Sequence, residues 1–167
     1  MRWSELERFL CRTVVLRWSF AAYVLLTLGF GAVMWIWDFQ VIDEIFLRQD
    51  ITSAVTALDE TQRQVHAVST ATLDVAYPFA YGAFQAGMAY RYLGRWGRWI
   101  APLSLVCIPV DLVEGFAQVM ILSDQMQYVT LKTVATPIKL ALYVPGLIAA
   151  LIALFVAGRE SRRGRPL

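Results

Sequence analysis

The sequence predicts an all-α polytopic membrane protein, a four-transmembrane-helix bundle with a helical outer loop. Of its 167 residues, 58% are hydrophobic and only 17% are charged, whereas soluble domains are about 25% charged. Four apolar stretches reach the roughly 20 residues that a helix needs to cross a bilayer. Because these stretches take up more than half of the chain, we expect a single integral membrane domain over residues 1–167. The predicted spans lie near residues 18–37, 69–90, 100–122 and 134–157.

The distribution of basic residues predicts that both termini are cytoplasmic. Cytoplasmic segments of membrane proteins carry an excess of Lys and Arg. Four Arg residues precede the first span, three lie in the segment RYLGRWGRW between the second and third spans, and four follow the last span. The segment between the first two spans is instead acidic, and residues 123–133 hold only Asp124 and Lys132. The short Arg-rich tail fits a bacterial inner (plasma) membrane best.

The long outer segment, residues 39–68, is expected to be helical because it contains neither Gly nor Pro. Its apolar side chains recur at roughly helical spacing, namely Ile45, Phe46, Ile51, Val55 and Leu58. We therefore predict one or two amphipathic helices. Such helices either lie on the membrane interface or control the entry of a substrate into the bundle.

Four ionisable residues interrupt the apolar stretches: Asp74, Asp111, Glu114 and Lys139. A charged group at membrane depth costs at least about 3 kcal/mol on insertion scales. Such residues are therefore expected to have a partner or a function. With a helical rise of 1.5 Å per residue, the predicted orientation puts all four in the outer half of the bundle.

Asp111, Glu114 and Gln118 are expected to share one helix face because they are three and four residues apart. This face must point into the bundle rather than toward lipid. Lys139 could neutralise one of the carboxylates. However, three carboxyl groups and one lysine cannot balance when all are ionised, so at least one carboxyl group is predicted to be protonated near neutral pH.

Prolines accompany the charged residues in the same stretches. A proline inside a helix removes a hydrogen bond and kinks the helix. Kinks beside the charges would widen the bundle there, so we predict a cavity at this position. The four prolines are Pro78, Pro109, Pro137 and Pro145.

Several kinds of chemistry lack their sequence signatures. His66 is the only histidine and is assigned to a loop, and Cys11 and Cys107 are far apart, so no zinc, di-iron or haem site is predicted. Nucleotide-binding and nucleophile-elbow motifs are missing, and the small net charge of +2 argues against nucleic-acid binding. We therefore expect no cofactor and no metal. Any catalysis would be acid–base chemistry by Asp and Glu.

Three segments carry a resemblance to a known family. They are WDFQVI around Asp38, LDVAYPFAYGAF around Asp74, and LYVPGLIAALIALFVA in the last span. Together with the four-span arrangement, they resemble the EXPERA group, which includes the emopamil-binding sterol isomerases and the sigma-2 receptor. The resemblance implies that Asp38 and Asp74 line a cavity that binds cationic amphiphiles or sterol-like lipids.

The chain also departs from that group. Asp111, Glu114 and Lys139 are not part of the group's pattern, and the histidine of the isomerases is missing from the spans. A second likeness covers residues 58–140, where LDETQRQVHAVSTATLDVAYPFAYGAF is followed by PVDLVEG and a lysine in the last span. These segments look like a family of small bacterial membrane proteins of unknown function, which implies no activity.

These observations leave three functions open. The first is an outer-half pocket that binds a membrane lipid or a lipid-like amphiphile, with acid–base isomerisation as an extension. The second is an accessory or assembly subunit whose charges form structural ion pairs with each other or with a partner membrane protein. The third is a proton-coupled transport element, with a homodimer as one form. The candidate ligand-binding or proton-handling residues are Asp38, Asp74, Tyr77, Asp111, Glu114, Gln118 and Lys139, and no catalytic residue is assigned.

Overall fold

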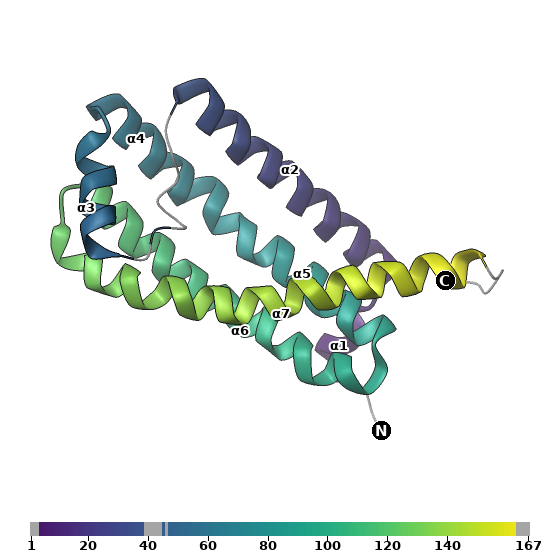
Figure 1. Ribbon diagram of the computed structural model, residues 1–167. Coiled ribbons are helices and arrows are strands. Elements are labelled where there is room, and N and C mark those ends of the chain that lie inside the picture. Colours follow the sequence, from purple (N-terminus) through teal and green to yellow (C-terminus); the bar gives the residue numbers. More distant parts are fainter. Residues whose placement is uncertain (1–3, 39–44, 46, 163–167) are drawn as a thin grey trace. The chain divides into compact units, whose positions relative to one another are not determined.

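The computed structural model describes residues 4–38, 45 and 47–162, and within these ranges it contains helices and no strand (Figure 1). The all-α prediction is therefore confirmed. Phe46 and residues 39–44 of the predicted outer loop lie outside the described residues. The α-helices are α1 (Glu5–Leu10), α2 (Thr13–Trp37), α3 (Arg48–Ala57), α4 (Glu60–Ser69), α5 (Val75–Tyr92), α6 (Gly94–Leu122) and α7 (Val129–Arg162). A π-helical turn, η1 (Thr70–Asp74), precedes α5, and a 3-10 turn, η2 (Met126–Tyr128), precedes α7.

Within the described residues, three helical segments are long and apolar enough to cross a membrane, which marks a membrane protein. They are Thr13–Trp37, Gly94–Leu122 and Met126–Arg159. They contain the first, third and fourth predicted spans but extend beyond them. The difference arises because each helix continues into polar flanks, which a search for apolar stretches leaves out.

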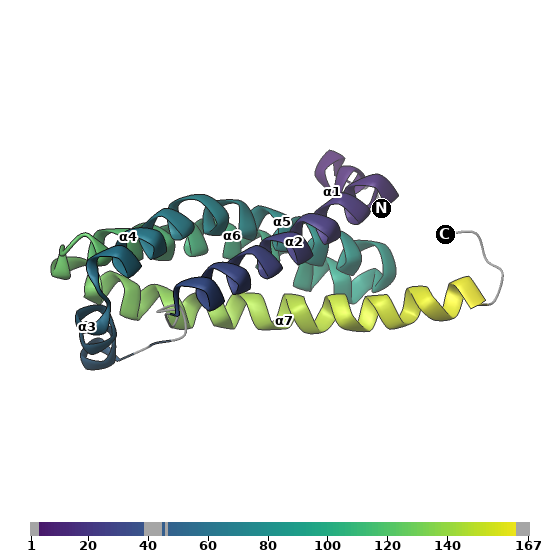
Figure 2. The same cartoon turned by 90° about the horizontal axis from the view of Figure 1, so that it is seen from above.

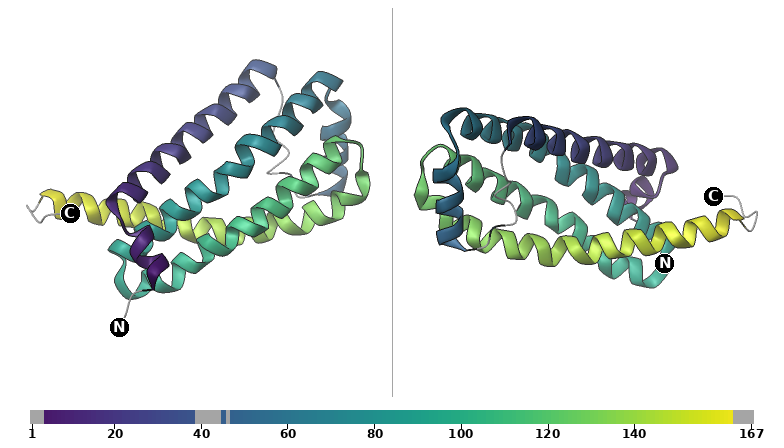
Figure 3. Two further views of the ribbon diagram at one scale, coloured as in Figure 1. Left: turned by 180° about the vertical axis from the view of Figure 1, so that it is seen from behind. Right: turned by 45° about the horizontal axis from the view of Figure 1, so that its top comes forward.

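The second predicted span, residues 69–90, covers the end of α4, η1 and most of α5 and is not among these three segments. Figures 2 and 3 show α4, η1 and α5 as one continuous helical path. Residues 84–90 of α5 are all buried. A helix that other helices enclose needs less apolar surface than one that faces lipid, which explains its more polar sequence.

The chain divides into two compact units. Unit 1 comprises Met1–Tyr23, Phe79–Ile108 and Ala141–Leu167, and unit 2 comprises Val24–Pro78 and Pro109–Leu140. Helices α2, α5, α6 and α7 each contribute one part to each unit.

Unit 1 is packed through small residues. Ala86, Ala101 and Ala149 belong to one of its buried clusters. A Cβ atom on Gly87 would lie only 2.5 Å from the carbonyl oxygen of Leu10. Small residues let helix backbones approach closely, as is typical of helix packing in membranes.

In unit 2, the segment for which one or two helices were predicted forms two helices, α3 and α4. Ile51 and Val55 of α3 are fully buried, and Figure 1 shows α3 beside the turn between α6 and α7. They share a buried cluster with Ile121, Leu122 and Val129. Outside this cluster, Arg63 of α4 pairs with Asp124 in the same turn at 2.9 Å.

The start of α4 is tied to the end of α2 by one side chain. Asp59 accepts a hydrogen bond from the backbone N–H of Gln62 at 2.7 Å, and the Gln62 side chain accepts one from the Asp59 N–H at 3.0 Å. This reciprocal arrangement is a capping box. The Gln62 amide also donates to the carbonyl groups of Trp37 and Asp38, at 3.1 and 3.2 Å. These contacts satisfy carbonyl groups at the end of α2, which have no helical partner.

Candidate functional site

The candidate site begins at an irregular helical turn that carries Asp74. Thr70–Asp74 form the π-helical turn η1, and Pro78 follows inside α5. Proline has no N–H to donate to the carbonyl group four residues earlier, which here is the carbonyl of Asp74. π-helical turns occur often at functional sites. The backbone is therefore irregular at the residue that carries the carboxyl group.

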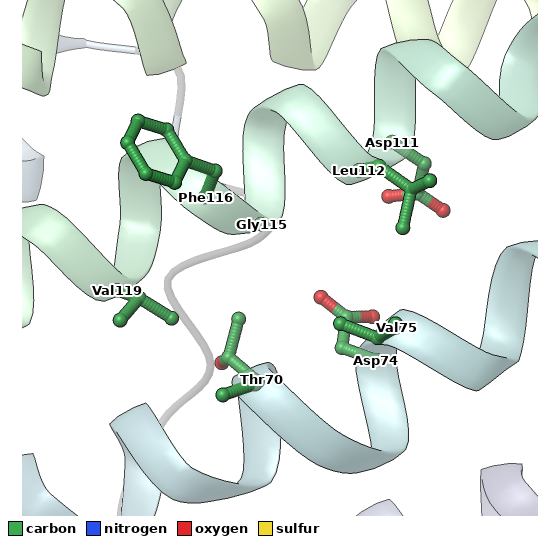
Figure 4. A pocket seen from close by; sticks show the side chains of 9 residues that line it. Thr70, Asp74, Val75, Asp111, Leu112, Gly115, Phe116 and Val119 are labelled. Atoms are coloured by element: carbon green, nitrogen blue, oxygen red, sulfur yellow. The ribbon is translucent and has the colours of Figure 1, made fainter.

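A cavity of about 230 Å³ lies beside this turn. Figure 4 shows that the carboxyl groups of Asp74 and Asp111 project into the space between η1 and α6. Thr70 adds a hydroxyl group to the wall. The remaining lining residues are Ala71, Val75, Leu112, Gly115, Phe116 and Val119. The cavity is thus mainly apolar and has two of the charged candidate residues in its wall.

A network of buried charges joins α6 to α7 next to Asp111. Glu114 Oε1 accepts hydrogen bonds from Lys132 Nζ at 2.8 Å and from Thr136 Oγ1 at 2.6 Å. Lys139 Nζ lies 3.1 Å from Asp111 Oδ1 and also pairs with Glu114. Lys132 and Glu114 are both 0% exposed. The two carboxylates of α6 are therefore held by the two lysines of α7.

Helical spacing explains why these side chains meet. Asp111 and Glu114 are three residues apart and lie on one face of α6, as predicted. Lys132, Thr136 and Lys139 are separated by four and three residues, so they share one face of α7. The two faces together bury the charges within unit 2.

Residues 123–133 were expected to form the loop between the last two spans, and this expectation is wrong for Lys132. Helix α7 begins at Val129, so Lys132 lies in its first turn with its side chain against Glu114. The predicted count of three carboxyl groups against one lysine is also wrong, because both Lys132 and Lys139 take part. The sequence indicates that Lys132 pairs with a buried carboxylate only through its spacing from Thr136 and Lys139. The residues next to Lys132 do not distinguish it from an ordinary residue at the start of a helix.

A second buried polar group links the cavity wall to α4. The Gln118 amide donates to His66 Nε2 at 3.1 Å and to Thr70 Oγ1 at 3.2 Å, and the three residues are at most 1% exposed. His66 Nε2 is therefore an acceptor in this arrangement. The assignment of His66 to a loop is wrong, because α4 begins at Glu60 and His66 faces the interior.

Asp38 and Tyr77, the other two predicted site residues, are not among the residues that line the cavity. Asp38 follows α2 with a positive φ of 47° and is exposed. The Tyr77 hydroxyl accepts a hydrogen bond from Thr27 at 3.3 Å. The structure thus brings Asp74 and Asp111 to the cavity, with Glu114 and Lys139 behind Asp111 and Gln118 behind Thr70.

Unit 2 also has a larger cavity, of about 510 Å³, between α2 and the α4–η1 segment. No ionisable residue is among those described in its wall, so it lacks groups that would orient a charged ligand. Its lining residues are Val33, Trp37, Gln64, Val65, Val68, Ser69, Thr72 and Leu73.

Across the described ranges, no three His, Cys, Asp or Glu side chains are arranged so that they could hold a metal ion. A comparison of the chain with known protein families, with curated proteins and with solved structures finds no match. The likeness to the EXPERA group therefore stays a prediction. The geometry of the cavity and its charges carries the functional assignment.

Proposed function

We propose that this membrane protein binds an amphiphile with a cationic head group in the cavity between η1 and α6. The observation that carries the proposal is the pair of carboxyl groups, Asp74 and Asp111, in a cavity with otherwise mainly apolar walls. Binding sites for small molecules usually combine apolar walls with a few polar groups that fix the orientation of the ligand.

The charges around the cavity favour a cation. Asp74, Asp111 and Glu114 supply three carboxyl groups, while Lys132 and Lys139 supply two ammonium groups. Ionisation of all five groups leaves one excess negative charge. Net charge is costly in a low-dielectric interior, so a positive charge in the cavity stabilises the site.

The size of the cavity suits a head group rather than a whole lipid. Its volume of about 230 Å³ corresponds to about eight water molecules and is below the roughly 300–1,000 Å³ of drug-sized pockets. Phe116 lines the cavity and contacts Tyr128 edge to face, with ring centroids 5.6 Å apart. Aromatic rings attract quaternary ammonium groups, which adds a second reason to expect a cation.

The membrane arrangement that we propose is a four-span bundle with cytoplasmic termini in a bacterial inner membrane. The α4–η1–α5 path would supply the fourth crossing. In this arrangement the cavity lies in the outer half of the bilayer, and an amphiphile enters from the outer leaflet. The support comes from the Arg-rich segments that flank the spans.

Native mass spectrometry of protein extracted gently from its own membrane, followed by lipid extraction, tests the proposal. We expect a stoichiometric cationic amphiphile with the wild-type protein and its loss in Asp74→Asn. The matched control is Asp50→Asn, which removes an exposed carboxylate of α3 in the same unit. Retention of the amphiphile in Asp74→Asn would contradict the proposal, as would a protein that carries a partner chain and no amphiphile.

The second candidate function is that of an accessory or assembly subunit. The fully buried pair of Glu114 and Lys132 favours it, because buried ion pairs can specify structure rather than chemistry. In that case the carboxyl groups at the cavity would be structural as well, and their removal would lower stability without a loss of ligand.

A further inference from the structure

We propose that one end of unit 1 is a binding surface for anionic phospholipids. The surface lies at the start of α2 and the start of α6, and it is separate from the cavity of unit 2. The inference therefore does not rest on the proposed function. We call it the arginine surface, and its members are the exposed residues Arg12, Arg17, Trp18, Arg95, Trp96 and Trp99.

The two units carry net charges of opposite sign. Unit 1 contains eleven Arg, no Lys and three Glu, whereas unit 2 contains four basic and ten acidic residues. Arg12 precedes the first of the three apolar segments, Arg95 lies in the first turn of the second, and Arg159 ends the third. These three segment ends all belong to unit 1. The protein thus concentrates positive charge at one membrane interface.

The packing of unit 1 brings the starts of α2 and α6 to the same place. Arg91, at the end of α5, donates through Nη1 to the carbonyl of Cys11 at 3.1 Å and to the hydroxyl of Thr13 at 2.8 Å. These two residues flank Arg12. Helix α6 begins two residues after α5 ends, and Arg95 is its second residue. Figures 1 and 3 show α1 beside the turn between α5 and α6. Arg12 and Arg95 therefore lie at the same end of unit 1.

The charges of the arginine surface are available to a ligand. Its three arginines pair with no carboxylate among the residues that the structure describes. The acidic residues of α1 have other contacts, because Glu7 accepts a hydrogen bond from the Ser4 N–H at 2.8 Å and Glu5 lies 4.0 Å from Arg8. Guanidinium groups bind phosphate through two parallel hydrogen bonds. A phosphate group therefore fits this surface.

The apolar members of the surface indicate a lipid rather than a soluble anion. Trp18, Trp96 and Trp99 are 73%, 74% and 73% exposed, and Leu6 and Phe9 of α1 are exposed as well. Tryptophan is enriched at the membrane–water interface, where basic side chains attract anionic lipids. A zwitterionic lipid would bring a positive group that the arginines repel. The combination of charge and exposed rings therefore fits an anionic phospholipid.

Native mass spectrometry of the wild-type protein in a neutral detergent tests the proposal, with phosphatidylglycerol and phosphatidylcholine of identical acyl chains as probes. The two lipids share the phosphate and the tails but differ in net charge. We expect phosphatidylglycerol to bind at least about tenfold more tightly, and this preference should shrink as the salt concentration rises. Equal Kd values for the two lipids at low salt would overturn the proposal.

Single variants test whether the arginine surface is the site. Arg12→Gln and Arg95→Gln should each weaken binding of phosphatidylglycerol by about fivefold, because each removes one positive charge near the lipid. Binding of phosphatidylcholine should stay unchanged. The matched control is Arg48→Gln, which removes an exposed arginine of α3 in unit 2 and should bind both lipids as the wild type does. An equal loss in Arg48→Gln would show that the net charge of the whole protein sets the preference, which would overturn the proposal.

Inorganic phosphate separates a lipid site from a site for a soluble anion. Added at the same concentration as phosphatidylglycerol, it should leave the bound lipid in place, because it cannot contact the exposed tryptophans as a lipid does. Displacement of the lipid by phosphate at that concentration would overturn the assignment to a phospholipid. The comparison of the two lipids is made on the wild-type protein, so it does not depend on the folding of a variant.

Discussion

Units 1 and 2 both bury polar side chains, but the chemistry of those side chains differs. In unit 1 they are hydroxyl, thiol and amide groups, such as the Tyr81 hydroxyl and the Cys107 thiol, which lie 3.1 Å apart. In unit 2 they include carboxylates and ammonium groups, of which Glu114 and Lys132 are fully buried. Polar groups in unit 1 accompany close packing, whereas the charges of unit 2 surround a cavity. This difference is the reason why the proposed ligand site lies in unit 2, whereas the interior of unit 1 is described by its packing.

Lys132→Met is expected to have the largest effect on stability. It removes one of the two lysines that pair with the buried Glu114 carboxylate, and breaking a buried pair in this way typically costs about 3–5 kcal/mol. The free energy of unfolding in a denaturing detergent measures the loss. The double variant with Glu114→Gln should recover part of it. A loss below about 1 kcal/mol in Lys132→Met would contradict the claim that unit 2, unlike unit 1, depends on buried charges for its stability.

Gly146→Ala should destabilise unit 1 by about 1–3 kcal/mol. A Cβ atom there would collide with Ser104 Oγ and with Gln85 Oε1, and both side chains are 0% exposed. The control is Gly158→Ala in the same helix, where the added Cβ meets nothing within 4 Å. That change should be neutral or stabilising, because Ala favours a helix over Gly. Equal thermal unfolding midpoints for the two variants would refute the account of close packing.

Tyr143→Phe should cost about 1 kcal/mol, the usual net value of one hydrogen bond. The change removes the hydroxyl partner of Tyr23 and keeps the ring, which packs edge to face on Tyr81 with centroids 4.9 Å apart. Removing both hydroxyls with Tyr23→Phe should cost little more than removing one. Fully additive losses in this double-mutant cycle would show that the two hydroxyls do not interact.

Asp124→Asn should have the smallest effect, between about 0 and 1 kcal/mol. Its ion pair with Arg63 is at the surface, with 75% of the Asp124 side chain exposed. Asn also tolerates the positive φ of 62° at this position, so the turn is retained. High salt should reduce the difference in unfolding free energy between the two proteins. A loss of unfolding free energy as large as that of Lys132→Met would show that buried and exposed ion pairs contribute equally to stability.

The sequence predicted the helices and part of the site because both follow from helical spacing in an apolar background. Asp111, Glu114 and Lys139 are conspicuous there, and their pairing was expected. Lys132 and His66 were missed because they lie just outside the apolar stretches, where a polar residue normally indicates a loop. Whether they are buried depends on where α7 and α4 begin. A search for apolar stretches locates the ends of a helix less well than its middle.

Other parts of the site required three-dimensional placement. The proline beside Asp74 predicted an irregular helix, yet the π-helical form of η1 has no signature in the sequence. Asp38 became a candidate through a family resemblance, and the structure puts it at the end of α2, where it does not line the cavity. Which polar residues share a cavity depends on tertiary packing rather than on local spacing.

The most direct test of the central claim measures stability and ligand binding of Asp74→Asn side by side. Asn has nearly the shape of a protonated Asp, so the free energy of unfolding should stay within about 1 kcal/mol of the wild type. Binding of decyltrimethylammonium should weaken by at least about tenfold, a change of roughly 1.4 kcal/mol in binding free energy. The opposite pattern, unchanged binding with a loss of several kcal/mol in stability, would show that the carboxyl groups at the cavity are structural.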